Sequence, residues 1–240
     1  MIALLGALDE EITGLVSGLE EERHGDWKGF TFHRGLLDGK SVVIAKVGVG
    51  KSLAAMLTQK IIDEFLPECL ILTGVAGAIN PDLDIGDTVV ARDCLQHDVD
   101  VTALGLKRGA IPFRSFRVFT CDERLVQFAR SCEPSADAPG ATDEARTPKV
   151  AVGRVLTGDT FLGRGMFESR RYLRDELSGD AVEMEGASMA LTATVNELPF
   201  LIIRTISDRA DGKAGVNFRR FMPWASRNSM RFVRHILRQM

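Results

Sequence analysis

Short, wholly apolar runs that alternate with segments of helical periodicity constrain this chain more than any other feature. Ile2–Ala7, Leu70–Leu72 and Leu201–Ile203, within a buried strand expected at Phe200–Ile206, are such runs, and their lack of polar alternation is typical of strands that are buried on both faces. The helical segments between them include Lys51–Phe65 and Ala187–Val195. This order predicts one α/β domain built on a mixed, largely parallel sheet.

The other segments extend the same alternation. We expect a helix from Asp9 through Leu19, a hairpin of Phe30–Leu36 and Ser41–Val47 around Asp38-Gly39, strands at Thr88–Ala91 and Val150–Leu156, helices at Glu123–Arg130, around Phe167–Glu176 and at Phe218–Arg238, and a small-residue loop at Thr73–Ala78. Pro223 is compatible with the last helix if it falls in the first turn. Residues 133–147, rich in Pro, Ala, Asp, Gly and Glu, are expected to form a mobile surface insertion and not a domain linker, because a strand follows at once. The single domain would then span residues 1–240.

Charge and cysteine usage exclude several classes of partner. The net charge of −3 gives no support for a nucleic-acid or anionic-membrane partner, and no apolar stretch approaches the ~20 residues of a membrane span. The N-terminal segment has no basic leader. Four scattered cysteines without C-x-x-C pairing suit a reducing compartment, although they could form two bridges, and Cys69 is expected in the core. We therefore expect a cytoplasmic protein.

Two motifs resemble ligand sites without meeting their requirements. Gly48–Ser52 ends like a phosphate-binding loop, but Ala45 occupies the position of the first glycine, so a tight turn into a helix is favoured. In His97–Asp100, alternation puts two carboxylates on one face, which is compatible with a divalent cation. No further ligands cluster nearby, and none of the four histidines has a partner at metal-ligand spacing. We expect no metal, and a structural or interface role for His97–Asp100.

Acidic residues follow several of the apolar runs. Leu201-Ile202-Ile203 leads into Arg204–Asp211, and the C-terminal ends of strands are where ligands collect in open α/β sheets. Asp208, held among apolar neighbours, can keep its proton near neutral pH and act as an acid. Glu10-Glu11 and Glu183–Glu185 also lie at the ends of apolar runs. Separate carboxylates at strand ends are suited to breaking a glycosidic bond.

Four blocks, in this order along the chain, together resemble the nucleosidase branch of the purine nucleoside phosphorylase superfamily: Gly6–Glu11, His97–Gly105, Val182–Ala187 and Arg204–Asp211. Within that branch the chain is similar to bacterial 5′-methylthioadenosine/S-adenosylhomocysteine nucleosidases from Met1 to about Phe221. The resemblance implies a three-layer, nucleoside phosphorylase-like α/β/α fold and a homodimer in which one subunit helps to wall the other's site. It implies a cofactor-free hydrolysis of 5′-modified adenosines to adenine and a 5-thioribose, as in methionine salvage.

The resemblance also implies a role for each matching residue. Asp208 is expected to protonate N7 of adenine, Glu11 to activate water and Arg204 to organise the water site. Glu185 is expected to bind the ribose hydroxyl groups. The other matching positions are Met184 against the sugar, Phe161 against adenine, the Leu162 backbone at the purine edge, Ser207 and Val75 beside the substrate, and Val49, Val101, Leu104, Pro112 and Phe218 around the 5′ substituent.

The chemistry independently requires such a set. Adenine leaves as a poor anion unless N7 is protonated as the bond breaks, and general acid catalysis contributes about 10²–10⁴-fold. An aspartate that titrates near ~3.9 in water must shift by about three units, roughly 4 kcal/mol, to stay protonated at neutral pH. Carboxylates near the sugar stabilise its oxocarbenium character. A neutral water becomes a competent nucleophile when a base such as Glu11 takes its proton.

Each candidate also has a simpler interpretation when it is taken alone. Glu10 and Glu11 could stabilise the first turn of a helix, and Glu185 could begin one. Asp208 could form a cap or turn. Phe161 and Met184 could pack in the core.

The sequence also predicts the nucleophile, and it departs from the family pattern in two places. Phosphorylases of this superfamily carry an arginine-containing turn after the first strand, whereas this chain has acidic residues there, so water is the expected nucleophile. Val75 stands where close relatives have a serine that helps to hold the water. Leu104 and Leu106 replace aromatic residues of the 5′ wall, which keeps a nucleosidase for a bulkier 5′ substituent as an alternative. A phosphorylase or a non-catalytic nucleoside-binding protein also stays open.

Overall fold

The computed structural model describes residues 1–133, 135, 147–162, 170–209 and 214–240, and it describes side chains in the last range from Phe221 onward. Its strands are β1 (Ile2–Gly6), β2 (Glu20–Trp27), β3 (Phe30–Leu37), β4 (Lys40–Lys46), β5 (Cys69–Ala78), β6 (Thr88–Gln96), β7 (Phe119–Thr120), β8 (Val150–Thr157), β9 (Ala181–Glu183) and β10 (Phe200–Asp208). Its helices are α1 (Asp9–Val16), α2 (Lys51–Phe65), a 3₁₀ turn η1 (Thr102–Leu104), α3 (Glu123–Arg130), α4 (Tyr172–Asp175), α5 (Gly186–Val195) and α6 (Ala214–Gln239). The insertion predicted at 133–147 lies almost wholly outside the described residues.

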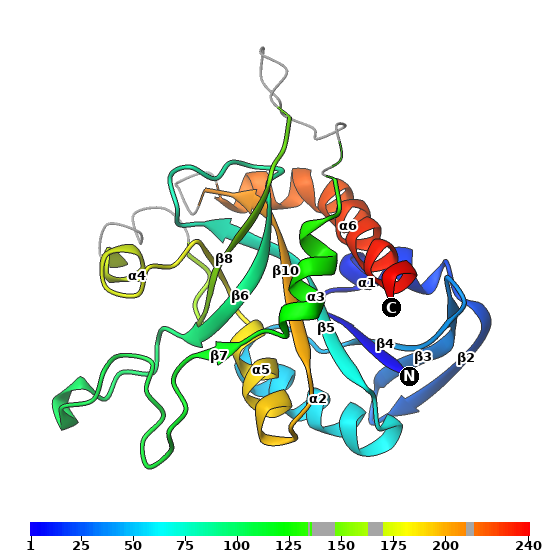
Figure 1. Cartoon of the computed structure of the whole chain (residues 1–240), viewed down its shortest axis with the longest axis horizontal. Coiled ribbons are helices and arrows are strands. Elements are labelled where there is room, and N and C mark those ends of the chain that lie inside the picture. Colours follow the sequence, from blue (N-terminus) through cyan, green and yellow to red (C-terminus); the bar gives the residue numbers. More distant parts are fainter. Residues whose placement is uncertain (134, 136–146, 163–169, 210–213) are drawn as a thin grey trace.

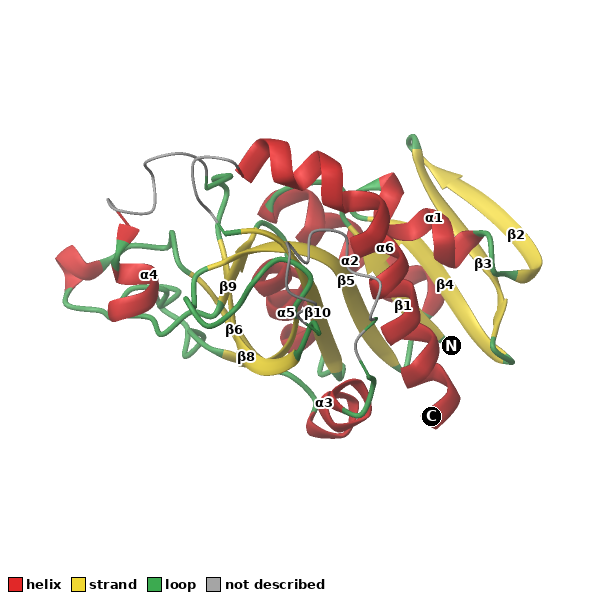
Figure 2. Ribbon diagram, turned by 90° about the horizontal axis from the view of Figure 1, so that it is seen from above, coloured by secondary structure: helices red, strands yellow, loops and turns green. Residues whose placement is uncertain are grey.

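The strands form one mixed sheet, as predicted (Figure 1). β4, β1, β5 and β10 are successive parallel neighbours, and β6, β8 and β9 form a second parallel group. β10 runs antiparallel to β6, while β5 pairs with both β9 and β10. These pairings close β5, β10, β6, β8 and β9 into a ring, from which β1, β4, β3 and β2 extend (Figure 2).

Helices cover the sheet in two groups, which gives the three layers that the resemblance implied. α2 packs against α5 in one group, and α6 contacts α1 and α3 in the other (Figure 1). α6 also packs directly on β5 and β10, the two strands that meet at the ring closure. None of the helices in the described part of the chain is both long enough and apolar enough to cross a bilayer.

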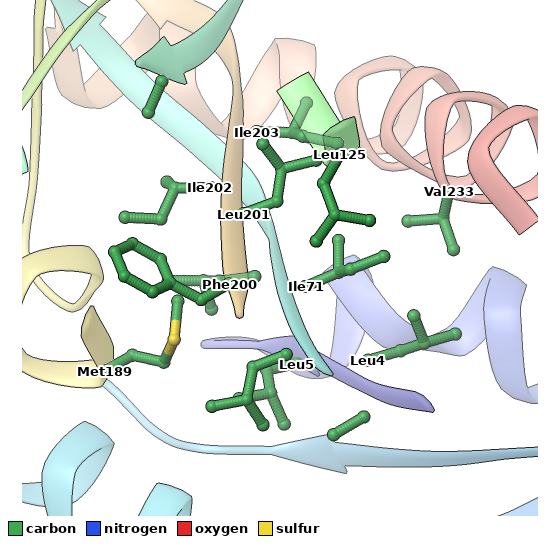
Figure 3. Packing of buried hydrophobic residues seen from close by; sticks show 14 of the residues in the cluster. Leu4, Leu5, Ile71, Leu125, Met189, Phe200, Leu201, Ile202, Ile203 and Val233 are labelled. Atoms are coloured by element: carbon green, nitrogen blue, oxygen red, sulfur yellow. The ribbon is translucent and has the colours of Figure 1, made fainter. Parts of the chain in front are cut away.

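The apolar runs seen in the sequence form the core between these layers. Leu4 and Leu5 of β1, Ile71 of β5 and Ile202 of β10 have no exposed surface, and their side chains gather where these strands lie side by side (Figure 3). Burial of each such side chain stabilises the fold by about 1.5–3 kcal/mol. Cys69, at the start of β5, is buried in the same cluster, as predicted. The continuous apolar runs therefore correspond to parallel strands that are buried on both faces.

Several strands differ from the sequence prediction. β2 was not predicted, because its charged residues are exposed and leave no apolar alternation to detect. β5 continues through Ala78, although Thr73–Ala78 was predicted as a loop, and every one of its residues is buried. Small residues suit this stretch because β10 and β9 pack directly beside it. The first helix ends at Val16, so Leu19 lies beyond it.

The C-terminal helix begins earlier than predicted. α6 starts at Ala214, which puts Pro223 inside the helix and not in its first turn. A proline there lacks the N–H group that an interior position donates, so one backbone carbonyl loses its partner. Pro223 is on the exposed side of the helix, where water can satisfy that carbonyl. The helix around Phe167–Glu176 is described only as α4, because residues 163–169 lie outside the described range.

Candidate active site

Three neighbouring strands bring distant parts of the sequence to one point. β1, β5 and β10 are parallel, so the C-terminal part of each lies at the same end of the sheet. Glu11 follows β1 in the first turn of α1, Val75 lies in the second half of β5, and Asp208 ends β10. The sheet topology, and not local sequence, therefore assembles the site.

A cavity of about 520 Å³ opens where these strands meet. Its size is in the range of small-molecule sites. It is lined by Ala7, Leu8, Glu11, Val49, Val75, Ala76, Gly77, Thr160, Phe161, Leu162, Val182, Glu183, Met184, Glu185, Ser207 and Asp208. Nine of the residues predicted for the site are in this lining: Glu11, Val49, Val75, Phe161, Leu162, Met184, Glu185, Ser207 and Asp208.

Glu11 is held in the cavity by three backbone amides. One carboxylate oxygen accepts the amide hydrogens of Ala7, at 2.6 Å, and Leu8, at 3.1 Å, and the other accepts the amide hydrogen of Val75 at 3.1 Å. Only 2% of Glu11 is exposed, whereas its neighbour Glu10 is on the surface. Burial raises the pKa of Glu11 above its ordinary value, against the opposing effects of the Arg204 charge and of these amides. Both Glu10 and Glu11 lie in the first turn of α1, as the simple interpretation predicted, but of the two only Glu11 also lines the cavity.

Gly74 makes room for this carboxylate. A Cβ atom at Gly74 would lie 2.3 Å from Oε1 of Glu11 and 2.3 Å from Nη1 of Arg204. Real Cβ atoms do not come that close to other heavy atoms. The missing side chain therefore creates the space in which the two charged groups meet.

Arg204 lies beneath the cavity and does not line it. Its guanidinium is 1% exposed and donates from Nη2 to a Glu183 oxygen and, at 3.2 Å, to Oε2 of Glu185. Burial alone would lower the pKa of Arg204, but the charges of Glu183, Glu185 and Glu11 together raise it above its ordinary value. The single positive charge of Arg204 therefore interacts with the side chains of three glutamates.

Glu183 is a residue to which the sequence analysis gave no role. Besides Arg204, its carboxylate accepts the hydroxyl hydrogen of Thr157 and the amide hydrogens of Glu185, at 3.0 Å, and Gly186, at 2.8 Å. These contacts fix the start of α5, which carries Glu185. The signal for Glu183 was its place in the same acidic block, but its partners Thr157 of β8 and Arg204 of β10 are distant in the sequence and cannot be read from spacing.

Glu185 is both a helix-start residue and a cavity residue. It precedes Gly186 as the N-cap of α5, and its Oε1 accepts the Gly50 amide hydrogen at 3.0 Å. Burial, followed by the nearby charge of Glu183, raises the pKa of Glu185 to about 8. The simple and the functional interpretations of Glu185 are therefore compatible.

Asp208 lines the same cavity from the end of β10. It is 3% exposed and lies at the end of β10, well before α6 begins, so it is not a helix cap. The Ser207 hydroxyl donates to Oδ2 of Asp208 at 2.9 Å, and it also lies 3.4 Å from the backbone oxygen of Ala76. A serine hydroxyl that donates to one carboxyl oxygen fixes the orientation of that group relative to the cavity.

The two apolar contact residues are not core residues. Phe161 is 49% exposed and projects at the cavity, and Met184 is half-buried in its lining. Leu162, by contrast, is 5% exposed and packs in a small cluster around Leu156 and Leu173. Phe161 thus follows a buried strand and precedes a buried leucine while its own ring stays accessible.

Three predicted 5′-pocket residues are not brought to the cavity of a single chain, and a fourth has a side chain outside the described residues. Val101, Leu104 and Pro112 lie in the segment after β6, and none of them is in the lining. Leu104 is 68% exposed and Phe113, in the same segment, is fully exposed. Phe218 is in α6, at a position whose side chain is outside the described part of the helix.

The two motifs that resembled ligand sites have structural contacts. Gly48 and Gly50 both have positive φ and form the tight turn into α2 that was predicted. Asp98 pairs with Lys51, and Asp100 pairs with Arg108. Among the described residues, no group of three or more His, Cys, Asp or Glu side chains could hold a metal ion.

Comparison with known proteins identifies the family. The model of the phosphorylase superfamily matches residues 1–238. A 5′-methylthioadenosine/S-adenosylhomocysteine nucleosidase of Bacillus cereus is 35% identical over 242 residues, which cover 100% of this chain and 99% of that protein. The crystal structure of such a nucleosidase from Neisseria meningitidis, in complex with methylthio-immucillin-A, has a TM-score of 0.88 at 34% identity and covers 100% of this chain and 99% of its own. A futalosine hydrolase of Helicobacter pylori has a TM-score of 0.86 at 30% identity, with coverages of 100% and 97%. The chain belongs to the phosphorylase superfamily and, within it, to the family of 5′-methylthioadenosine/S-adenosylhomocysteine nucleosidases.

Proposed function

We propose that this protein hydrolyses the N-glycosidic bond of 5′-methylthioadenosine and S-adenosylhomocysteine, releasing adenine and a 5-thioribose. The observation that carries the proposal is that Glu11 and Asp208, from opposite ends of the chain, line the same buried cavity together with Glu185. An acid, a base and a sugar-binding carboxylate are the groups that this reaction requires. The nucleosidases of the family act on these two substrates, as their names state.

Asp208 acts as the general acid. Its carboxyl group gives a proton to N7 of adenine while the bond between C1′ and N9 breaks and the bonding electrons pass to the purine. Its burial at the end of an apolar strand supports a carboxyl that keeps a proton, because burial disfavours the charged form. The Ser207 hydroxyl supports the required orientation of the group.

Glu11 acts as the general base. It takes a proton from a water molecule while the water oxygen forms a bond to C1′, so the sugar gains a hydroxyl group and Glu11 holds the proton. The amides of Ala7, Leu8 and Val75 fix the carboxylate before substrate arrives, which removes the cost of orienting the base. Arg204 beside Glu11 helps to keep it ionised in a buried place.

Water is a better nucleophile here than phosphate. The amides at the start of α1 that could bind an anion are donated to Glu11, and the amides at the start of α2 are donated to Glu185 and Asp159. Even with Glu185 protonated, as its pKa of about 8 implies at neutral pH, Glu11 and Glu183 place two carboxylates near the single Arg204 guanidinium, and the excess negative charge repels a phosphate dianion.

The substrate lies with its purine beside Phe161 and its ribose beside Glu185. The accessible ring of Phe161 supports stacking on adenine, and the Leu162 backbone is placed to meet the purine edge. Met184 packs against the sugar, and Glu185 accepts the ribose hydroxyl hydrogens. Carboxylates below the sugar stabilise the positive charge that develops on it as the bond breaks.

A nucleosidase for another 5′-substituted adenosine is a second candidate. The similarity to the futalosine hydrolase of Helicobacter pylori is nearly as great as that to the nucleosidases. In the proposed dimer, Leu104 and Leu106 in place of aromatic residues would favour flexible 5′ substituents without selecting one of them. Competition between substrates that differ only at the 5′ position would separate the two candidates.

We further propose that the single domain works as a homodimer in the cytoplasm, in methionine salvage. The segment after β6 exposes Leu104, Leu106 and Phe113, which is costly in a monomer. A second copy would bring Val101, Leu104 and Pro112 over the mouth of the neighbouring cavity, where Val49 is half exposed. Four buried, free cysteines support a reducing compartment.

The test is incubation of the purified protein with 5′-methylthioadenosine and with S-adenosylhomocysteine, with and without phosphate, followed by identification of the products. Release of free adenine and a 5-thioribose at a rate independent of phosphate is expected. A sugar 1-phosphate product would replace the proposal by a phosphorylase. Stoichiometric binding without release of base would replace it by a nucleoside-binding protein.

A further inference from the structure

The two motifs that resembled ligand sites are joined by a network of charged side chains beside the cavity. Lys51, at the first turn of α2, donates from Nζ to Oδ1 of Asp98 at 2.7 Å. The other oxygen of Asp98 accepts the amide hydrogen of Asp159 at 2.9 Å. Oδ1 of Asp159 in turn accepts the Lys51 amide hydrogen at 2.8 Å, and its Oδ2 lies 3.8 Å from Nζ. These contacts form a closed triangle, which we call the Lys51 clamp.

The clamp holds the segment that carries the predicted purine contacts. Asp159 directly precedes Thr160, Phe161 and Leu162, all of which line the cavity. The segment leaves the sheet at the end of β8, and the clamp fastens it to α2 one residue after Gly158. Phe161 is 49% exposed, and the backbone contacts of Asp159, two residues before it, contribute to holding its ring at the cavity.

Charge makes the clamp stronger than ordinary surface ion pairs. The side chains of Lys51 and Asp98 are only 18% and 27% exposed, which limits screening by water. Although burial opposes it, the hydrogen bond from Lys51 lowers the pKa of Asp98, so the carboxylate stays ionised at neutral pH. Asp159 also accepts at the N-terminus of α2, where the helix dipole favours a negative charge.

The same turn of α2 contacts the sugar side of the cavity. The Gly50 amide donates to Glu185 at 3.0 Å, and the Lys51 carbonyl accepts from Ser188 of α5 at 2.7 Å. These two contacts fix the start of α2 to α5, and the clamp in turn joins the start of α2 to the segment that carries Phe161. Lys51 is thus one link between the purine contact and the ribose contact, beside the direct contacts of Thr157 and Gly158 with Glu183.

We propose that Lys51 and Asp98 are positioning residues, which hold Phe161 in place to bind the purine without touching the substrate themselves. The inference rests on the proposed function for the role of Phe161, but it can be tested by equilibrium binding of adenine, independently of catalysis. This role would explain the two motifs, Gly48–Ser52 and His97–Asp100, which have no part in the proposed reaction.

The test compares Lys51→Met and Asp98→Asn with the wild-type protein and with Lys60→Met. Lys60 pairs with Glu64 on the same helix α2, so it is a matched control for loss of a paired lysine. Calorimetry should give an adenine dissociation constant about tenfold higher for the two clamp variants, because a correctly placed aromatic contact to a base is worth about that much. Lys60→Met should leave it unchanged, and Lys51→Arg, which keeps the charge, should restore most of the affinity.

Kinetics and a double variant separate positioning from general destabilisation. In 5′-methylthioadenosine hydrolysis the clamp variants should raise KM about tenfold and change kcat much less. In a Phe161→Ala background, Asp98→Asn should weaken adenine binding no further, since it acts through Phe161. Multiplicative losses in that background, or an unchanged dissociation constant in both clamp variants, would overturn the proposal.

The two proposals fail in different ways. A wild-type protein that binds adenine but releases none from the nucleosides contradicts the proposed function, while the dissociation constants still decide the clamp. A wild-type protein that binds no adenine contradicts both. Should Asp98→Asn not fold, the comparison of Lys51→Met with Lys51→Arg decides the inference, because the two variants differ in the charge that Lys51 presents to Asp98 and Asp159.

Discussion

The amide of Val75 donates to Oε1 of Glu11 at 3.1 Å, while the Val75 side chain lines the cavity and packs against Met222 and Trp224. The backbone at this position therefore keeps its contact with the proposed base, although the serine of close relatives is absent. What the valine cannot supply is a hydroxyl group to hold the attacking water.

Val75→Ser should therefore raise kcat for 5′-methylthioadenosine hydrolysis severalfold, because a hydroxyl hydrogen bond contributes about 1 kcal/mol. It should also lower the melting temperature, since apolar packing is lost. Val75→Ala is the matched control, because it loses the same packing and gains no hydroxyl. Equal kcat values for the serine and alanine variants would contradict a water-holding role at this position.

Asp208→Asn should abolish adenine release while the fold survives. An asparagine keeps the shape of the side chain but cannot give a proton to N7, so kcat should fall by about 10²–10⁴-fold. The rate of adenine formation and the melting temperature are the measurements. Ser207→Ala is the companion variant, and it should reduce kcat less, since it only orients the acid. Turnover near the wild-type rate in Asp208→Asn would reject the assignment of the acid.

Glu11→Gln should retain nucleoside binding and lose hydrolysis. The amide of glutamine cannot take a proton from water, whereas the ribose and purine contacts are made by other residues. The neighbour Glu10 is exposed, so Glu10→Gln makes the same chemical change outside the cavity and should leave kcat unchanged. Calorimetry with a nucleoside and a hydrolysis assay give the two readouts. The opposite pattern, hydrolysis kept and binding lost, would show that Glu11 is not the base.

The stability of the protein should fall as the pH rises from about 6.5 to about 8. The folded-state pKa of Glu185 is raised to about 8, so in this range the folded protein holds a proton that the unfolded chain has released. Stability then decreases by up to about 1.4 kcal/mol per pH unit. His97, whose pKa burial lowers to about 4, changes stability only below this range. Denaturant unfolding at several pH values measures the slope, which Glu185→Gln should flatten. An unchanged slope in the variant would assign the effect to another group.

Leu104→Asp should shift the protein from dimer to monomer and raise KM for 5′-methylthioadenosine. A charge at the exposed Leu104 disfavours burial against a second copy. Light scattering reports the mass. Val195→Asp is a control, because Val195 is similarly exposed at the far end of α5. A monomeric wild-type protein with full activity would remove the proposed role of the partner.

The sequence predicted those parts of the fold in which local pattern and burial agree. The bounds of α2 and α3 match their predictions, because α2 has a periodic apolar face that follows a glycine turn, and α3 has an Asp122 cap and Arg130 in its last turn. β2 and β9 were missed since one is exposed and charged and the other has only three residues. Their existence depends on pairing with distant strands, which no local pattern encodes.

The candidate site was predictable as a set of residues but not as a network. Glu11, Glu185 and Asp208 could be named because each follows an apolar run in a block typical of the family. The contacts of Glu183 to Arg204 and Thr157, and those of Lys51 to Asp98 and Asp159, join side chains from different strands and helices. Such contacts appear only when the sheet order is known.

The excess of carboxylates around Arg204 has a consequence for inhibitors. Glu11, Glu183 and Glu185 share a single guanidinium, and the amides that could attract an anion are already used by protein carboxylates. The neutral sugar of a nucleoside gains little binding energy from this surplus of negative charge. A compound with a protonated nitrogen in the ring that replaces the ribose would meet it directly, and a phosphorylated analogue would be rejected.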